Sequence, residues 1–241
     1  MSRHSVFFEL MDALGQPGCA LCRLATESVL QYFGSLGYEQ VTDVELRDEL
    51  RAGGGFCARH AWLFHEASGN RLGVAIIYRD LLHHALVGLK AGRQVGGGLG
   101  RRLAGLLAGG RAAEPAGRQR AHRCSACRFE AEAEERFRST LLEHLAEADV
   151  RRRYAESAGL CLPHLARGLE SGGRAEDLAW LRQDAAERLG AIVAELDEYI
   201  RKHDYRFRKE GWGEERDAPR RAVERAVGRP IRPEKALHSE R

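Results

Sequence analysis

The chain has 241 residues, of which 44% are hydrophobic and 30% are charged, and its net charge at pH 7 is +3. This hydrophobic content is enough for a buried core, and the length fits one large domain or two smaller ones. A net charge so close to zero excludes any inference of a nucleic-acid or membrane partner from overall charge alone.

The N-terminal residues carry Glu9 and Asp12 and lack the apolar stretch of a secretory signal. No run of about 18 apolar residues is present, so we expect no membrane span. Only four lysines accompany the many arginines, alanines and glycines, which is typical of GC-rich bacterial coding. We therefore expect a cytoplasmic bacterial protein, in which paired cysteines indicate metal ligands or redox groups before disulfides.

Apolar residues recur at helical spacing along the first half, and no hairpin signal interrupts them. Thr42 followed by Glu45 is a capping-box pattern, so we expect Thr42 to be the N-cap of a short helix. The predicted helices cover residues 6–14, 20–36, 42–52, 57–67 and 72–90.

The second half repeats this order of elements. Helices are predicted over residues 127–145, 150–157, 162–169 and 175–209, with a shorter helix over 99–108 that corresponds to 6–14. Residues 216–227 are expected to form a short helix at most, and residues 231–241 to be disordered.

The predicted fold class is therefore all-α, with two tandem pseudo-repeats of a helical unit, each stapled by a Cys3His metal site, and a long helix in the C-terminal half. The expected organisation is an N-terminal repeat over 1–91, a Gly/Arg-rich linker over 92–123, a C-terminal repeat over 124–210 and a basic, partly disordered tail over 211–241.

The six cysteines are divided equally between the repeats, and each repeat adds one histidine at the same place. A CxxC pair is followed 35 positions later in the first repeat, and 34 positions later in the second, by a CxxH motif. The candidate ligands are Cys19, Cys22, Cys57 and His60 in the first repeat, and Cys124, Cys127, Cys161 and His164 in the second.

Three thiolates and one imidazole form the ligand set of a closed tetrahedral zinc site. We predict two Zn²⁺ ions per chain, with an iron–sulfur cluster or a redox dithiol as alternatives, because thiolates also suit those groups. We assume that each ion is bound within one repeat, and an exchange of ligands between the halves is the alternative. Gly55 and Gly159 precede the CxxH motifs and predict tight turns there.

A closed site has no position for water, so we predict no catalytic residues at the metal. His83 and His84 with Asp80 are a candidate for a further metal or acid–base site, because Asp80 and His84 lie four residues apart on one helical face. Their equivalents in the second repeat, Asp184 and Arg188, do not keep the histidine, which favours a solvated helix face.

Basic and aromatic residues alternate at the end of the long predicted helix. A cationic helix end is favoured by the helix dipole alone, but such a patch could also bind a phosphate backbone. In the scaffold hypothesis Tyr205 and Phe207 pack against the preceding repeat. The possible anion or nucleic-acid contacts are Arg201, Lys202, Arg206 and Arg208.

Together these motifs resemble an uncharacterised bacterial family that carries a domain of unknown function with duplicated CxxC and GxCxxH motifs. The resemblance covers roughly residues 7–230 and includes Val41-Thr42-Asp43, Gly55-Phe56-Cys57, Gly159-Leu160-Cys161 and the segment Lys202–Phe207. Members often have proline after the first cysteine of each pair, where this chain has Ala20 and Ser125. The resemblance implies no activity.

Three classes of function follow. The first is a non-catalytic, zinc-stapled helical scaffold or adaptor that binds another macromolecule, expected to be a protein. The second is a nucleic-acid-binding protein that uses its arginine-rich segments, and the third is a thiol redox or iron–sulfur protein. The sequence leaves the cellular role and the oligomeric state open.

Overall fold

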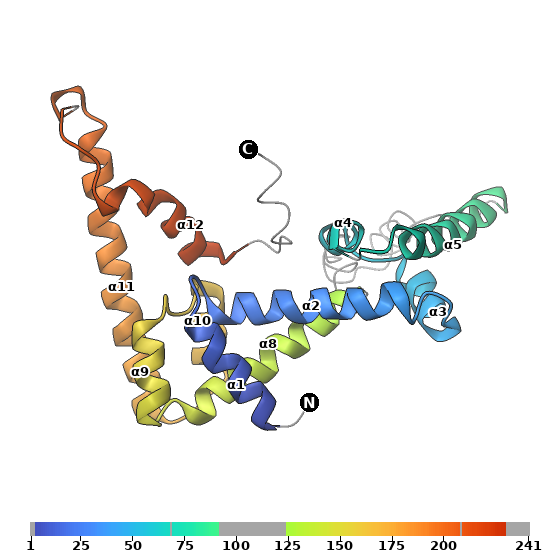
Figure 1. The fold of residues 1–241 in the computed structure, drawn as a ribbon, viewed down its shortest axis with the longest axis horizontal. Helices are drawn as coiled ribbons and strands as arrows, with labels where there is room; N and C mark the ends of the chain where they lie inside the picture. The colour runs from blue at the N-terminus through green and yellow to red at the C-terminus, as the bar shows by residue number, and fades with distance from the viewer. Residues whose placement is uncertain (1–2, 68, 92–123, 208, 230–241) are drawn as a thin grey trace, which may run out of the picture. The chain divides into compact units, whose positions relative to one another are not determined.

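The computed structural model describes residues 3–67, 69–91, 124–207 and 209–229, and these residues contain helices and no strand (Figure 1). The all-α prediction is confirmed, and the order of helices repeats as expected. The predicted linker and the end of the tail lie outside the described residues. The helices are α1 (Arg3–Leu14), α2 (Ala20–Tyr38), α3 (Val44–Gly53), α4 (Ala58–Ala67), α5 (Arg71–Lys90), α8 (Ser125–His144), α9 (Ala148–Glu156), α10 (Leu162–Glu170), α11 (Ala175–Lys202) and α12 (Ala218–Val227), with 3₁₀ turns η1 (Tyr205–Phe207) and η2 (Glu214–Asp217).

The chain forms two compact units, and each unit combines residues of both sequence repeats. Among the described residues, unit 1 lies within 3–25 and 133–229, and unit 2 lies within 26–91 and 124–132. Helices α2 and α8 each begin in one unit and end in the other. The predicted division at residues 91, 123 and 210 follows the sequence repeats, and it stays a prediction.

The core of unit 1 forms where α1 packs with the beginning of α2, the second half of α8, and helices α9 to α11. Leu10, Leu21, Leu141 and Leu181 are fully buried there. Tyr154 is 1% exposed, and its hydroxyl accepts the Leu160 amide at 3.3 Å. This bond connects α9 to the turn before Cys161.

The core of unit 2 is aromatic. Phe33 of α2 contacts Phe56 and Phe64, with ring centroids 5.3 and 5.2 Å away. Tyr32 stacks on Phe129 at 5.1 Å. The Tyr32 hydroxyl donates to Ser125 Oγ at 3.1 Å.

Two predicted helix ends are wrong. The N-cap of α3 is Asp43 rather than Thr42, because the Asp43 carboxylate accepts the Leu46 amide at 2.8 Å. Helix α11 ends at Lys202, seven residues before the predicted Lys209. The Asp204 carboxylate accepts the Arg206 amide at 3.0 Å, and this local bond competes with continuation of the helix.

Helix α5 is long and apolar enough to cross a membrane by length and composition, although the sequence analysis predicts no span. Several of its residues belong to the fold of unit 2. Ile77 is 1% exposed in the core, and Asp80 near the middle of the helix makes ion pairs with α3. These contacts favour a helix that is part of unit 2.

The Asp80 carboxylate is bound by two arginines of α3. Arg47 donates to it at 2.8 Å, and Arg51 donates to both of its oxygens at 2.7 Å. Hydrogen bonds from Arg51, and then from Arg47, lower the pKa of Asp80 to about 2. His84 is exposed, and the Asp80 carboxylate is held by arginine, so the solvated-face interpretation fits this helix.

We predict that Asp80→Asn lowers the free energy of unfolding of unit 2 by about 1–2 kcal/mol, because two charge-assisted contacts are lost. Asp48→Asn is the control, since Asp48 also contacts Arg51 but is 65% exposed, and it should have little effect. The pKa of Asp80 is lower in the folded protein than in the unfolded chain. The carboxylate therefore stabilises the fold fully at pH values above the unfolded-state pKa, and this stabilisation is lost as the pH falls through the folded-state pKa. Denaturant titrations between pH 7 and 2 should therefore show the Asp80→Asn difference shrinking below about pH 4. A constant difference across this range would contradict the assignment.

Candidate metal centre

The eight predicted ligands form two clusters, and each cluster takes ligands from both repeats. Cys19 and Cys22 lie with Cys161 and His164 in unit 1, and we call this cluster site A. Site B lies in unit 2 and consists of Cys57, His60, Cys124 and Cys127. The assumption that each site forms within one repeat is therefore wrong, and the exchanged arrangement is present.

The length of α2 explains the exchange. This helix continues to Tyr38 and carries the chain about 24 Å from Cys22 before it turns. The following helix, α3, has only 10 residues and spans about 15 Å, too little to return to the beginning of α2. The CxxH motif that follows therefore meets the beginning of α8, where the second CxxC pair lies.

In both clusters the ligands lie at the beginnings of helices. Cys19 and Cys124 directly precede α2 and α8, and their carbonyls accept the amides of Arg23 and Arg128 at 3.2 Å. Cys161 is the N-cap of α10. Two helix N-termini therefore face each cluster, and their amide dipoles stabilise thiolates.

The predicted turns before the CxxH motifs are present. Gly55 and Gly159 have φ values of +85° and +70°, in the left-handed region that favours glycine. The Gly55 amide bonds the Leu50 carbonyl at 2.7 Å and closes the end of α3. These turns orient Cys57 and Cys161 toward the other ligands.

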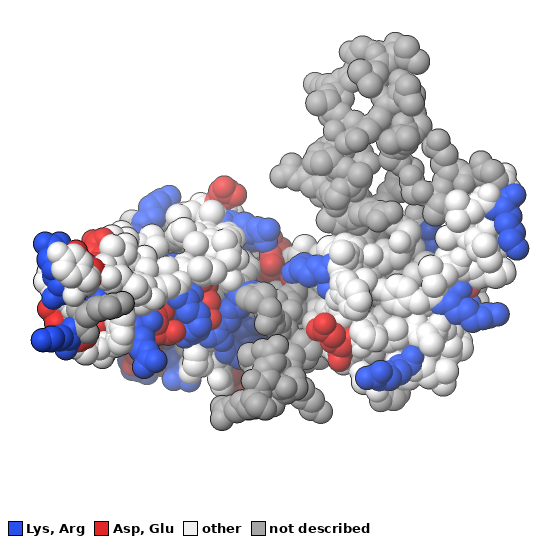
Figure 2. Space-filling view, turned by 90° about the horizontal axis from the view of Figure 1, so that it is seen from above, with Lys and Arg blue, Asp and Glu red and all other residues white. Residues whose placement is uncertain are grey.

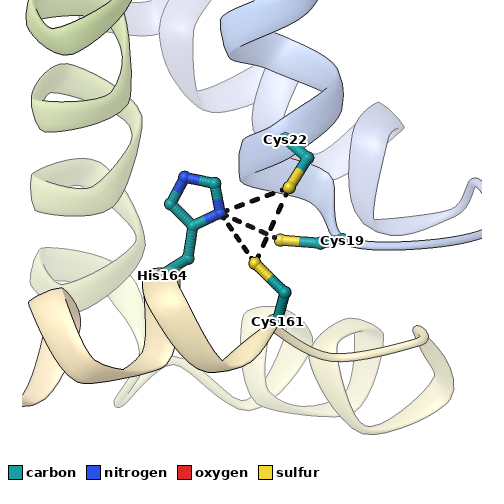
Figure 3. Close-up of side chains that lie close together, drawn as sticks. All are labelled: Cys19, Cys22, Cys161 and His164. Atoms are coloured by element: carbon teal, nitrogen blue, oxygen red, sulfur yellow. Dashed lines mark hydrogen bonds between the residues drawn. The ribbon is translucent and has the colours of Figure 1, made fainter. Parts of the chain in front are cut away.

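Site A brings three sulfurs around one imidazole nitrogen (Figure 3). His164 Nδ1 lies 3.4 Å from the sulfurs of Cys19 and Cys22, and 3.1 Å from that of Cys161. The sulfurs of Cys22 and Cys161 are 3.7 Å apart. All four residues are buried or half-buried.

Site B has the same geometry. His60 Nδ1 lies 3.4, 3.6 and 3.3 Å from the sulfurs of Cys57, Cys124 and Cys127. The sulfurs of Cys57 and Cys127 are 3.6 Å apart. His60 is fully buried, whereas Cys57 and Cys127 are half-buried.

These distances fit a tetrahedral ion. Zn–S and Zn–N distances of about 2.3 and 2.05 Å place two sulfur ligands about 3.8 Å apart, and a sulfur and a nitrogen about 3.6 Å apart. The measured sulfur–sulfur distances, 3.7 and 3.6 Å, are close to the first value. Most sulfur–nitrogen distances lie slightly below the second value, so the residues could hold such an ion with little movement.

The thiols of one cluster compete for ionisation. Hydrogen bonding to Cys161 and Cys22 holds the pKa of Cys19 well below its usual range, while the same interactions raise the pKa of Cys22. Burial opposes protonation of the imidazoles, but the thiols outweigh it and raise the pKa of His60 to about 9 and that of His164 to about 11. Several thiolates can coexist at this spacing only with a cation among them.

Two glutamates of α8 face the outer nitrogens of the histidines. Glu134 Oε1 lies 3.2 Å from His164 Nε2, and Glu130 Oε2 lies 3.6 Å from His60 Nε2. Each glutamate also binds an arginine, Arg167 in unit 1 and Arg59 in unit 2. A carboxylate there favours the tautomer whose Nδ1 is free to bind a metal.

The sequence analysis missed these two glutamates. Several acidic residues occur in this part of α8, and neither their spacing nor their type distinguishes the two that face a histidine. Only the positions of His60 and His164 beside α8 identify them.

Three of the four proposed anion contacts are held by acidic residues of the chain. Arg201 binds Glu198 at 2.7 Å and also Glu210, and its guanidinium lies 4.4 Å from the Phe207 ring centroid. Lys202 binds Glu215 at 2.6 Å. Arg206 binds Asp204 at 2.7 Å, and Arg208 lies outside the described residues.

Among the described residues on the face that Figure 2 shows, acidic side chains are interspersed with basic ones. Tyr205 is 80% exposed, so the expectation that it packs against the preceding repeat is wrong. The loop after α11 is closed by its own ion pairs and leaves this tyrosine outside.

Comparisons with known proteins agree with the extent of the repeated pattern. The family model described as "Family of unknown function (DUF6062)" matches residues 1–232. A relative from Caldicellulosiruptor sp. (strain Rt8B.4), named "Uncharacterized 23.9 kDa protein in xynA 3'region", is 37% identical over 73 residues, which are 30% of this chain and 35% of the relative. The matched stretch thus spans about a third of that relative's length. No solved structure matches.

The exchanged arrangement predicts the outcome of two double variants that each remove two thiols. Cys19→Ser with Cys161→Ser removes two ligands of site A, so the protein should keep one zinc ion. Cys19→Ser with Cys57→Ser damages both sites, so the protein should keep none. Elemental analysis after gel filtration distinguishes them, and ligation within each repeat would reverse the two results.

Proposed function

The chain belongs to the family of unknown function whose model spans residues 1–232, and from that premise we propose that it is a zinc-stapled helical scaffold or adaptor that binds another protein in the cytoplasm. The observation that carries the proposal is the pair of Cys3His clusters with near-tetrahedral spacing. Each cluster connects helix beginnings that are far apart in sequence.

Zinc is the ion that this donor set suits best. Three soft thiolates and an imidazole in tetrahedral array are typical of structural zinc sites, whereas magnesium and calcium prefer oxygen ligands. Iron–sulfur clusters are usually held by four cysteine thiolates, whereas site A and site B each offer only three. The carboxylates beside both histidines add the outer contact that zinc-binding histidines commonly make.

A non-catalytic role follows from the number of donors. Four protein ligands fill a tetrahedral ion and leave no position for a water or a substrate. The ligand residues are half-buried or buried, which suits a structural connection. We therefore assign the clusters a role in holding the helices together.

Exposed apolar side chains support a protein partner. Leu82, Leu86 and Leu89 of α5 follow each other at helical spacing and are 69%, 47% and 61% exposed. Tyr205 and Trp212, after α11, are 80% and 45% exposed. Exposed apolar and aromatic residues of this kind are common at protein interfaces.

The nucleic-acid alternative has less support. Arg201, Lys202 and Arg206 are each held by a carboxylate of the chain, so phosphate binding there would require breaking existing ion pairs. A phosphate-binding surface normally presents unpaired cations along one face. The arrangement of charges favours a structural role for this loop.

We predict that anaerobically purified protein contains two zinc ions per chain and is colourless, because zinc has a filled d shell and no visible charge-transfer bands. Elemental analysis and absorption spectroscopy measure both properties. Fewer than one zinc per chain would contradict the proposal, and brown colour with iron would favour the iron–sulfur alternative.

Removing the metal should unfold both units, because structural zinc binding contributes on the order of 10 kcal/mol, comparable with the stability of a whole domain. Excess chelator should lower the helical circular-dichroism signal and the melting temperature, and added zinc should restore both. Cys57→Ser should destabilise unit 2 more than unit 1, as followed by amide exchange. Unchanged helicity and melting temperature after complete removal of metal would contradict the structural role.

A further inference from the structure

The C-terminal residues 214–229, comprising η2, α12, Gly228 and Arg229, pack against site A. We propose that this segment, called the cover, is a metal-dependent closing element of site A: the bound ion holds the cover in place, and the cover slows release of the ion. The inference rests on the proposed zinc binding, and it adds a control on how fast one of the two sites releases its ion.

The cover is bound to the turn that leads into Cys161. The Arg225 guanidinium donates to the Leu160 carbonyl at 2.7 Å and also to the Ala158 carbonyl. Both carbonyls flank Gly159, the residue whose positive φ makes the turn. Arg225 therefore stabilises the backbone that positions this ligand.

Gly228 places its backbone directly against the ligand sulfurs. A Cβ added there would lie 2.9 Å from Cys22 Sγ and 3.4 Å from Cys161 Sγ, which belong to the two different ligand motifs. The residue is buried, with φ of +81° and ψ of 178°, a conformation essentially restricted to glycine.

Arg229 extends the contact to the other ligand loop. Its Nε would lie 2.8 Å from a Cβ added at Gly18, the residue before Cys19. Its position is supported by an ion pair with Glu224 at 3.2 Å. The cover thus contacts both loops that carry the cysteines of site A.

Few apolar contacts hold the cover. Val223 and Val227 of α12 are 61% and 69% exposed, and Ala218 is its only buried apolar residue within the described chain. Its other attachments are polar, such as Arg221 with Glu195 of α11. A segment with so little apolar burial opens at low free energy, so its docking depends on the ligand loops staying in place.

A bound ion would fix those loops. Without it, no bond joins the side chains of the two ligand motifs, and the turn at Gly159 and the loop at Gly18 are free to move apart. This coupling is reciprocal. The free energy by which the bound ion stabilises the docked cover equals the free energy by which the docked cover stabilises the bound ion. Gly228 is therefore a positioning residue for site A.

The test compares zinc release in the full-length, zinc-loaded chain. Gly228→Ala pushes the cover away from the sulfurs, and we expect one of the two ions to transfer to a chromogenic chelator roughly tenfold faster than in the unchanged protein. Gly172→Ala is the control, because Gly172 has φ of +80° in the same unit with nothing within 4 Å of an added Cβ.

Arg225→Gln tests the same contact without a change of backbone strain. This variant should speed up both the release of the same zinc ion and the amide hydrogen exchange of residues 218–228. The amide exchange of α9 should not change. Arg220→Gln is its control, since Arg220 lies on the same helix and its ion pairs are with Asp217 and Glu224, which belong to the cover itself and not to the turn at Gly159. Normal release of both ions from Gly228→Ala and Arg225→Gln would overturn the inference. A chain that binds no zinc would instead overturn the proposed function.

Discussion

The convergence of two helix N-termini on one Cys3His cluster is the interaction on which each unit depends. Four buried or half-buried polar ligands would destabilise a core without an ion, because thiolates at 3.7 Å repel one another. With an ion they connect segments that lie up to 145 residues apart in the sequence. The remaining apolar contacts then assemble around this connection in unit 1 and in unit 2.

The exchange of ligands makes the two repeats interdependent. Since each cluster takes its CxxC pair from one repeat and its CxxH motif from the other, neither repeat can complete a site alone. Helices α2 and α8 also contribute to the core of both units. Each cluster therefore requires residues of both repeats.

The two sites are not equivalent despite the shared ligand pattern. Both outer glutamates come from α8, whereas α2 has Ala25 and Val29 at the corresponding positions. Site A has the additional contact with Gly228. The two copies of the CxxC helix therefore differ in the carboxylates that they place beside the histidines.

The sequence by itself determined the helical class, the eight ligands and the turns at Gly55 and Gly159, because helical periodicity, metal chemistry and glycine's freedom at positive φ are local properties. It did not determine which ligands share an ion. Either CxxC pair could combine with either CxxH motif, and both combinations give three thiolates and one imidazole at each ion. Only the tertiary structure decided this, by placing each CxxH motif beside the CxxC pair of the other repeat, and only it distinguished Glu130 and Glu134 from their acidic neighbours. The ion pairs of Arg201 with Glu210 and of Lys202 with Glu215 were likewise decided by tertiary structure, because these glutamates reach the two cations only after the chain turns back beyond α11.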